Sequence, residues 1–199
     1  MSEWRKVELH SHTLASPDSR LSLETIIRVN QERGIDALAV TDHNTMDGAF
    51  ELAARAPFTV ILGEEIKSTE GEIIGLFLSE PIPRDMSPVE TVAAIKAQGG
   101  LVLVPHPFDR FRRSALGQEA TDSIVSDIDI VEVFNGRTLR HRDNDLADAY
   151  AHSHGCVRSV GSDSHLAVEI GRCWQSVSYT HLRAHETLRY LVCRLLLEK

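Results

Sequence analysis

Short apolar runs alternate with helix-like segments along most of the chain, and this alternation constrains the fold more than any other feature. Strands are expected at residues 7–10, 36–41, 59–62, 72–78, 101–104, 128–133 and 157–160. Helices are expected at residues 21–33, 46–54, 87–98, 119–126 and 140–153. Repeated strand–helix units are typical of a largely parallel sheet or barrel. The sequence therefore predicts an α/β fold.

Capping residues mark the ends of several predicted helices. Ser22 stands where an N-cap is expected for the first helix, and Gly34 stands at its end. Ser87 and Pro88 begin the third helix, with proline at the first helical position, where its missing N–H costs nothing. Glycines also end the third and fifth helices, so the helix boundaries rest on turn chemistry as well as on apolar spacing.

Length and composition indicate one soluble globular domain. The chain has 199 residues, of which 42% are hydrophobic and 25% charged. No apolar run is long enough to span a bilayer and the N-terminus lacks a signal-like stretch, so a cytoplasmic protein is expected. The three cysteines, Cys156, Cys173 and Cys193, form no CxxC pair, which favours reduced thiols over disulfides or a zinc–thiolate site.

The net charge of −8 argues against certain partners. An acidic chain attracts duplex nucleic acid poorly, so stable duplex binding is not expected, and neither is a membrane partner. A small phosphorylated substrate, such as a nucleotide or an oligonucleotide end, stays open. Bound divalent cations would reverse the local sign of charge at a site rich in carboxylates.

Histidines and carboxylates cluster where the predicted strands end. His10 and His12 are two residues apart on a strand, so their imidazoles share a face and form half of a metal site. Further candidates follow later strands: Asp42, His43, Glu64, Glu65, His106, Asn135, Asp163 and His165. Parallel sheets and barrels place active sites at the carboxyl ends of strands. We therefore expect these side chains to converge.

The donor set predicts the chemistry. Histidine, aspartate and glutamate without cysteine suit Zn, Mn or Fe. A site with more than four such ligands can hold two ions, and paired ions roughly 3.5–4 Å apart activate water and clamp phosphoryl oxygens. Hydrolysis of a phosphate ester is the reaction that such a site favours.

Five motifs give the chain a family resemblance. They are His10-x-His12, Thr41-Asp42-His43, Gly63-Glu64-Glu65-Ile66, Val104-Pro105-His106-Pro107 and Gly161-Ser162-Asp163-Ser164-His165. In this order, over residues 7–172, they resemble the PHP (polymerase and histidinol phosphatase) family. The resemblance implies a distorted (β/α)7 TIM-like barrel, two or three divalent metal ions (Mn, Zn or Fe) and phosphoester hydrolysis.

The resemblance also implies a set of metal ligands. These are His10, His12, Asp18, His43, Glu65, His106, Asp163 and His165. Glu72 stands where many relatives have a histidine, and it could bind metal or be a solvated strand residue. Asn135 falls where relatives place a ligand or near-ligand, and the same two alternatives apply.

Catalytic residues are expected near the metals. Arginine suits bidentate phosphate contacts, and Arg137 is the first candidate because it follows Asn135 closely. The arginines at 110, 112 and 113 are further candidates, and a surface role is the alternative for each. In the proposed mechanism a metal-bridged hydroxide attacks phosphorus, and Asp42, His43 or a metal-bound water assists proton transfer. Asp42 could instead only orient a ligand.

Several functions fit this interpretation. A nucleotide or short-RNA-end phosphoesterase is the first, and a small-metabolite phosphatase such as histidinol phosphatase is the second. A non-catalytic metal-binding module is the alternative from a different class. Hydrolysis of C–N bonds, as in amidohydrolases, usually needs a bridging lysine, and no motif here supplies one.

The last 22 residues differ in character from the rest. The predicted phosphoesterase domain spans residues 1–177, and residues 178–199 contain none of its motifs. That tail resembles translated adapter sequence, which would not have evolved to pack here. The alternative is a genuine C-terminal helix over residues 185–197 that closes the barrel.

Overall fold

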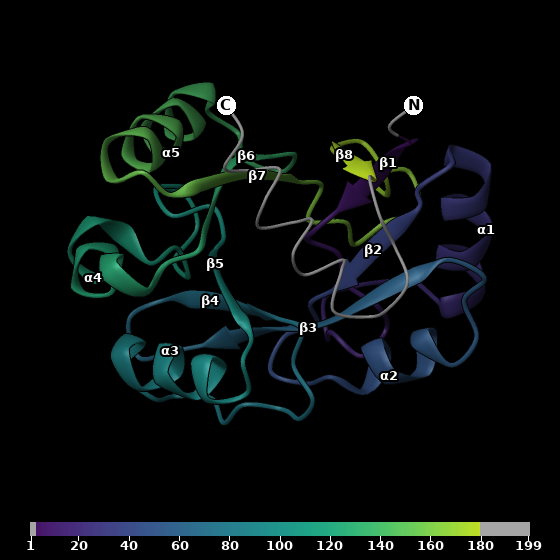
Figure 1. The fold of residues 1–199 in the computed structure, drawn as a ribbon, viewed down its shortest axis with the longest axis horizontal. Helices are drawn as coiled ribbons and strands as arrows, with labels where there is room; N and C mark the ends of the chain where they lie inside the picture. The colour runs from purple at the N-terminus through teal and green to yellow at the C-terminus, as the bar shows by residue number, and fades with distance from the viewer. Residues whose placement is uncertain (1–2, 180–199) are drawn as a thin grey trace.

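A computed structural model describes residues 3–179, and one curved sheet of eight strands forms its centre (Figure 1). The strands are β1 (Glu3–Glu8), β2 (Ala37–Val40), β3 (Thr59–Lys67), β4 (Glu72–Leu76), β5 (Leu101–Val104), β6 (Ile130–Asn135), β7 (Val157–Gly161) and β8 (Gln175–Tyr179). Their order is β7-β6-β5-β4-β3-β2-β1-β8. The predicted α/β barrel is confirmed, and it carries one more strand, β8, than the sequence indicated.

Helices surround the sheet on its outer side (Figure 1). They are α1 (Leu23–Arg33), α2 (Asp47–Ala53), α3 (Pro88–Ala97), α4 (Gly117–Ser123) and α5 (His141–His154). The segment expected to be one helix at residues 119–126 is α4 followed by a short 3-10 turn at Val125–Asp127. No helix among the described residues is long and apolar enough to cross a membrane.

The predicted capping residues fix the ends of α1 and α3. The Ser22 side chain accepts the Thr25 N–H, and Gly34 ends α1 with a left-handed φ of 64°, which glycine adopts without strain. At α3, Ser87 and Glu90 form a reciprocal capping box, with Pro88 in the first turn. Local chemistry therefore sets these boundaries, as predicted.

Not all strands run in the same direction. β1, β2 and β3 are parallel neighbours, as are β5, β6 and β7, but β4 is antiparallel to both β3 and β5. Glu72, the first residue of β4, consequently pairs with Lys67, the last residue of β3. The beginning of β4 thus lies at the same end of the barrel as the carboxyl ends of the parallel strands, and Glu72 reaches the site from there.

Two different segments pair with the outer edge of β1, and these pairings nearly close the barrel. Along the strand itself β8 pairs antiparallel, with Val7 opposite Gln175. Beyond the strand, the segment after β7 takes over: the Asp163 N–H donates to the His10 carbonyl and the His12 N–H donates to the Ser164 carbonyl, each at 3.0 Å. This second pairing places His10 and His12 beside Asp163.

β3 is longer than the sequence predicts. It runs to Lys67 rather than ending at residue 62, because the antiparallel partner β4 continues its hydrogen bonding. Glu64 and Glu65 therefore lie within β3 instead of following it. Since successive side chains of a strand point to opposite faces, the two glutamates point in opposite directions.

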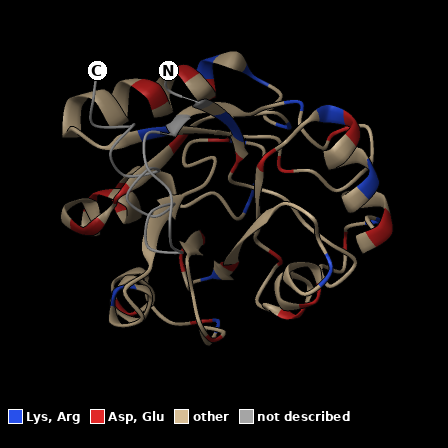
Figure 2. Cartoon of the chain, turned by 45° about the vertical axis from the view of Figure 1, so that its right-hand side comes forward, with Lys and Arg blue, Asp and Glu red and all other residues tan. Residues whose placement is uncertain are grey.

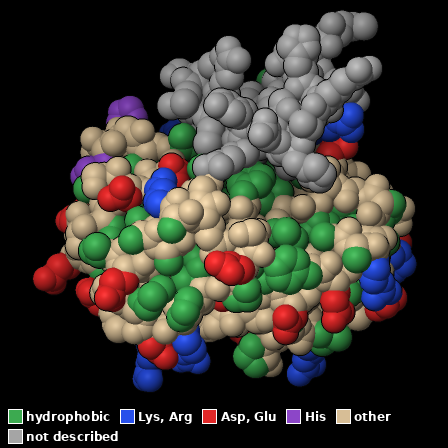
Figure 3. All heavy atoms as spheres, turned by 60° about the horizontal axis from the view of Figure 1, so that its bottom comes forward, with side chains coloured by type: hydrophobic (Ala, Val, Ile, Leu, Met, Phe, Trp, Pro, Cys, Tyr) green, Lys and Arg blue, Asp and Glu red, His purple; other side chains and the backbone are tan. Residues whose placement is uncertain are grey.

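Apolar side chains fill the barrel and the space between sheet and helices. One cluster consists of strand residues, among them Val7, Ile61, Ile74 and Leu103, and forms the floor beneath the site. Two others join the sheet to the helices. Charged residues of both signs are interspersed over the helices and loops (Figure 2), and the face at the bottom of Figure 1 mixes hydrophobic and polar side chains (Figure 3).

Candidate metal centre

Four side chains from the ends of β1, β3 and β7 meet at the centre of the barrel mouth. The Nε2 atoms of His10 and His12 lie 3.2 Å apart. Asp163 Oδ1 is 3.5 Å from the first of these nitrogens and 3.3 Å from the second. His10, His12, Glu65 and Asp163 are all at most 1% exposed. Imidazole nitrogens and carboxylate oxygens thus face one another in a buried space.

Glu65 links four histidines. Its Oε1 lies 3.5 Å from His10 Nε2 and 3.2 Å from His106 Nε2. Its Oε2 lies 3.4 Å from His12 Nε2 and 3.1 Å from His43 Nδ1. Each carboxylate oxygen therefore serves a different pair of histidines, as expected for a group that bridges two positions.

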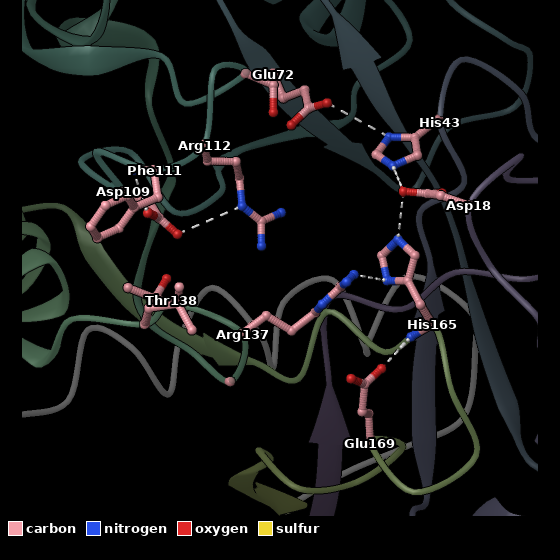
Figure 4. A pocket seen from close by; sticks show the side chains of 13 residues that line it. Asp18, His43, Glu72, Asp109, Phe111, Arg112, Arg137, Thr138, His165 and Glu169 are labelled. Carbon is pink, nitrogen blue, oxygen red and sulfur yellow. Dashed lines mark hydrogen bonds and ion pairs between the residues drawn. The ribbon is translucent and has the colours of Figure 1, made fainter.

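An outer group of residues continues the cluster toward solvent. Asp18 Oδ2 lies 3.5 Å from His43 Nε2 and 3.2 Å from His165 Nε2, and Glu72 Oε1 lies 3.8 Å from His43 Nδ1 (Figure 4). The Asp18 side chain is 56% exposed, unlike the inner residues. The predicted ligands therefore separate into a fully buried inner group and an outer group in which Asp18 reaches solvent.

The donor atoms of these residues fit divalent cations. Four overlapping sets have ligand atoms within 4.8 Å of one another: His12, His43 and His165; His10, His12 and Asp163; His10, His106 and Glu132; and His43, Glu65 and Glu72. Buried atoms of the same residues, including Glu65 Oε2, Asp163 Oδ1 and His165 Nε2, lie close to the groups named above but form no hydrogen bond with any described residue. Unpartnered buried acceptors are costly, and a cation among them would satisfy them.

The electrostatics of the cluster follow from burial and opposite charge. Burial alone would raise the pKa of Glu65, but His10, His106 and His43 hold that pKa well below its usual range. Burial would lower the pKa of His10, yet Asp163, Glu132 and Glu65 raise it well above its ordinary value. Protons on histidine thus balance the carboxylates, and a bound cation, which requires neutral imidazole, would displace them.

Glu132 is a site residue that the sequence analysis missed. It lies on β6, is 1% exposed, and its Oε1 is 3.0 Å from His10 Nδ1. Its Oε2 accepts the backbone N–H of His106 at 2.9 Å. Glu132 therefore orients His10 so that Nε2 faces the cluster. The sequence did carry a signal for Glu132, because it is the one charged residue in the apolar run 130–134. A carboxylate is rarely buried in such a strand unless it has a partner.

Asn135, for which the sequence left a ligand role open, lies beside the cluster. Its Oδ1 accepts the backbone N–H of Arg137 at 2.9 Å, so its amide nitrogen faces the carboxylates. That nitrogen donates to Glu132 Oε2 at 2.9 Å and to Asp163 Oδ2 at 3.3 Å. In this orientation the amide N–H groups of Asn135 hold two carboxylates in place, and its role as a metal ligand stays a prediction.

Asp42, predicted either to assist proton transfer or to orient a ligand, has a full set of hydrogen bonds within the protein. It is fully buried and accepts hydrogen bonds from the Thr13 N–H at 2.6 Å, the Thr13 hydroxyl at 2.7 Å and the Ser16 hydroxyl at 2.7 Å. Ser16 Oγ in turn lies 3.1 Å from His12 Nδ1 and accepts the His43 N–H at 3.0 Å. These contacts favour the orienting role that the sequence left open for Asp42.

Glu64 points away from the cluster. Its Oε2 accepts the Ile82 N–H at 2.7 Å, and burial raises its pKa to about 7. The structure thus separates the two adjacent glutamates, with Glu65 in the site and Glu64 against the loop before α3.

A cavity of about 760 Å³ opens beside the outer group (Figure 4). Its lining residues are Asp18, His43, Glu72, Asp109, Phe111, Arg112, Ser114, Gly136, Arg137, Thr138, Leu139, His165 and Glu169. Two predicted arginines reach it: Arg112 Nη2 lies 2.7 Å from Asp163 Oδ2, and Arg137 Nη1 lies 2.6 Å from His165 Nδ1. Arg110 instead pairs with Asp143 at 3.2 Å.

Comparison with known proteins identifies a family whose sequence model matches this chain. The sequence model of the PHP domain matches residues 8–165. An uncharacterized protein of Methanocaldococcus jannaschii is 44% identical over 151 residues, which cover 69% of this chain and 84% of that relative.

Two crystal structures share the fold. One is a two-domain protein of Bacteroides vulgatus that contains a predicted PHP-like metal-dependent phosphoesterase; it has a TM-score of 0.75 and 20% identity, and the match covers 96% of this chain but only 63% of that protein. The other is a candidate metal-dependent phosphoesterase of Bifidobacterium adolescentis, with a TM-score of 0.70, 18% identity and 98% of each chain covered.

Proposed function

This chain belongs to the PHP domain family, and we propose that it is a metal-dependent phosphoesterase that hydrolyses a phosphate ester at the barrel mouth. One observation carries the proposal. The nitrogens of His10 and His12 converge with the oxygens of Glu65 and Asp163 in a buried cluster, with acceptors that lack partners. A cavity lined by Arg112 and Arg137 adjoins this cluster.

The inner and outer groups would hold two or three divalent ions. We assign the inner position to His10, His12, Glu65, His106 and Asp163, and the outer position to Asp18, His43, Glu72 and His165. Such ions, when bound, supply Lewis-acid activation of water and neutralise charge on phosphoryl oxygens. The mixed imidazole and carboxylate donors suit Mn, Zn or Fe.

The side chains of the cavity bind and orient the substrate. The guanidinium groups of Arg112 and Arg137 are placed to donate paired hydrogen bonds to phosphate oxygens. Arg112 is held by Asp163, so its position is fixed relative to the inner group. His43 also lines the cavity, and as a ligand of the outer position its imidazole would hold a metal ion and would not carry the proton of the leaving group.

The first substrate class that we propose is a nucleotide or a short RNA end. A cavity of about 760 Å³ is far larger than a phosphate group requires and is of the size that binds small organic molecules. A small-metabolite phosphatase, such as a histidinol phosphatase, is the second candidate.

Metal analysis combined with a substrate screen tests the proposal. The purified full chain is analysed by mass spectrometry for bound metals and assayed with phosphomonoesters and phosphodiesters in added Mn²⁺. We expect bound metal and turnover in the wild type, and loss of both in His10→Ala and His12→Ala by at least about a hundredfold in rate. His152→Ala on α5, outside the site, is the control. Metal bound without turnover of any ester would favour a non-catalytic metal-binding module instead.

A further inference from the structure

Two large apolar side chains project into the cavity from different loops. Phe111 belongs to the loop between β5 and α4, and Leu139 to the loop between β6 and α5. They are 63% and 80% exposed, and both line the cavity. A single exposed apolar residue needs no explanation. Two exposed apolar side chains that line the same cavity, next to charged residues, indicate a surface that a ligand covers.

The cavity has two chemically different ends (Figure 4). His43 and His165 lie at one end, and Phe111 and Thr138 lie at the other. The side chains of Arg112 and Arg137 extend between these ends. A ligand that fills the cavity therefore carries its anionic group beside the histidines and its apolar part against Phe111.

An unpartnered hydroxyl lies at the apolar end. Thr138 Oγ1 is buried, and it has no hydrogen-bond partner among the described residues although it lines the cavity. A buried hydroxyl without a partner is unfavourable unless a ligand atom or water satisfies it. A ligand whose apolar part has a polar edge that reaches this hydroxyl would satisfy it.

The backbone of Phe111 is anchored near the anionic end. Its backbone N–H donates to Asp109 Oδ1 at 3.1 Å, and Asp109 is 6% exposed. The next residue, Arg112, is paired to Asp163 of the inner group at 2.7 Å. The loop that carries Phe111 is thus connected, through Arg112, to Asp163, which we assign to the metal centre.

From these observations we propose that Phe111 and Thr138 form a ring-binding subsite, and that the substrate is a phosphate ester whose alcohol carries a planar ring with a polar edge, as a nucleoside monophosphate does. Phe111 stacks on the ring, and Thr138 Oγ hydrogen-bonds to its edge. The proposal rests on the proposed phosphoesterase function and adds to it the residues that select the substrate.

A matched pair of substrates tests the subsite. Adenosine 5′-monophosphate and ribose 5-phosphate share the phosphate and the sugar and differ in the ring. We expect wild-type kcat/KM to favour the nucleotide, and Phe111→Ala to raise KM for the nucleotide by about tenfold with kcat nearly unchanged. Ribose 5-phosphate should be affected little. Phe111→Tyr should restore the preference, and Thr138→Val should weaken it.

Trp4→Ala removes an aromatic ring of similar exposure, 60%, far along the chain from the cavity and serves as the control. Equal kcat/KM for both substrates in the wild type, or an equal effect of Phe111→Ala on both, would overturn the subsite. Calorimetric binding of adenosine 5′-monophosphate separates the two proposals. If no ester is hydrolysed but binding still depends on Phe111, the phosphoesterase function fails and the subsite stands.

Discussion

Neighbouring residues of the same type have different tasks in this protein. Glu64 and Glu65 are both fully buried, yet only Glu65 contacts the histidine cluster. Strand geometry separates them, because successive side chains point to opposite faces. Histidine and glutamate at the site thus acquire their roles from position rather than from chemical type.

Replacing Glu64 should change how stability depends on pH. Burial raises the folded-state pKa from an ordinary 4.5 to about 7, so the stability associated with the protonated carboxyl is complete below about pH 4.5 and is lost as pH rises through 7. Glu64→Gln cannot ionise, and its amide oxygen can still accept the Ile82 N–H. We expect its melting temperature to exceed that of the wild type at pH 8, with the difference shrinking toward pH 4.5. The exposed Glu51→Gln should show no such trend, and a difference independent of pH would contradict the explanation.

Glu132 should control metal affinity without being exposed to substrate. Glu132→Gln keeps the shape of the side chain but loses the charge that holds His10 Nδ1. Loss of such an orienting partner typically costs 10–100-fold in metal affinity, and we expect a decrease of about this size. Competition with a coloured chelator measures it, with Glu51→Gln again as the reference. An affinity equal to that of the wild type would exclude an orienting role.

At the scale of elements, two strand pairings build the site. The antiparallel insertion of β4 brings Glu72 to the barrel mouth, and the segment after β7 pairs with residues 10–12. Both depend on contacts between segments that are far apart in sequence. A change in either pairing should therefore affect the cluster even when no ligand is altered.

Gly161 at the end of β7 tests the second pairing. A Cβ at this position would lie 2.1 Å from Glu132 Oε1 and 2.7 Å from His10 Cβ, so Gly161→Ala must displace one of them. We expect reduced metal content together with a lower melting temperature. Gly155→Ala is the matched control: its φ of 68° makes alanine strained, but no atom of the described residues lies within 4 Å of the added Cβ. That variant should lose stability and keep its metal, and equal metal loss in both would refute the steric argument.

β8 should contribute to stability through its pairing with β1. It buries Val177 at 3% exposure and covers the outer edge of β1. A chain that ends after residue 174 lacks the strand, and we expect its melting temperature to fall by roughly 5–10 °C. A chain that ends after residue 179 keeps β8 and, if the tail resembles adapter sequence, should melt like the full chain. The predicted domain end at residue 177 falls inside β8, and most of the tail lies outside the described residues.

At the scale of the whole molecule, one end of the barrel gathers carboxylates. The net charge of the chain is −8, and the inner and outer groups, together with Glu132, bring five carboxylates together there: Asp18, Glu65, Glu72, Glu132 and Asp163. Histidines and Arg112 balance part of this charge. Divalent cations in the same place would bind the folded chain and not the unfolded one.

Added metal should therefore stabilise the fold. We expect Mn²⁺ to raise the melting temperature of chelator-treated protein by several degrees, since binding to the folded state alone stabilises it. The double variant His10→Ala/His12→Ala should not respond, while His152→Ala should respond like the wild type. A rise in melting temperature that persists in the double variant would place the stabilising metal elsewhere.

The sequence by itself determined the α/β alternation, the caps of α1 and α3, and the identity of most residues in the cluster. These depend on spacing, turn chemistry and strand ends, all of which are encoded within a few neighbouring residues. The tertiary structure alone decided which way each side chain faces. In it, Asp42 faces Thr13 and Ser16, and the amide nitrogen of Asn135 faces the carboxylates. Glu132, which the sequence analysis missed, contacts His10. Those outcomes depend on strand direction and register, which only contacts between distant segments can fix.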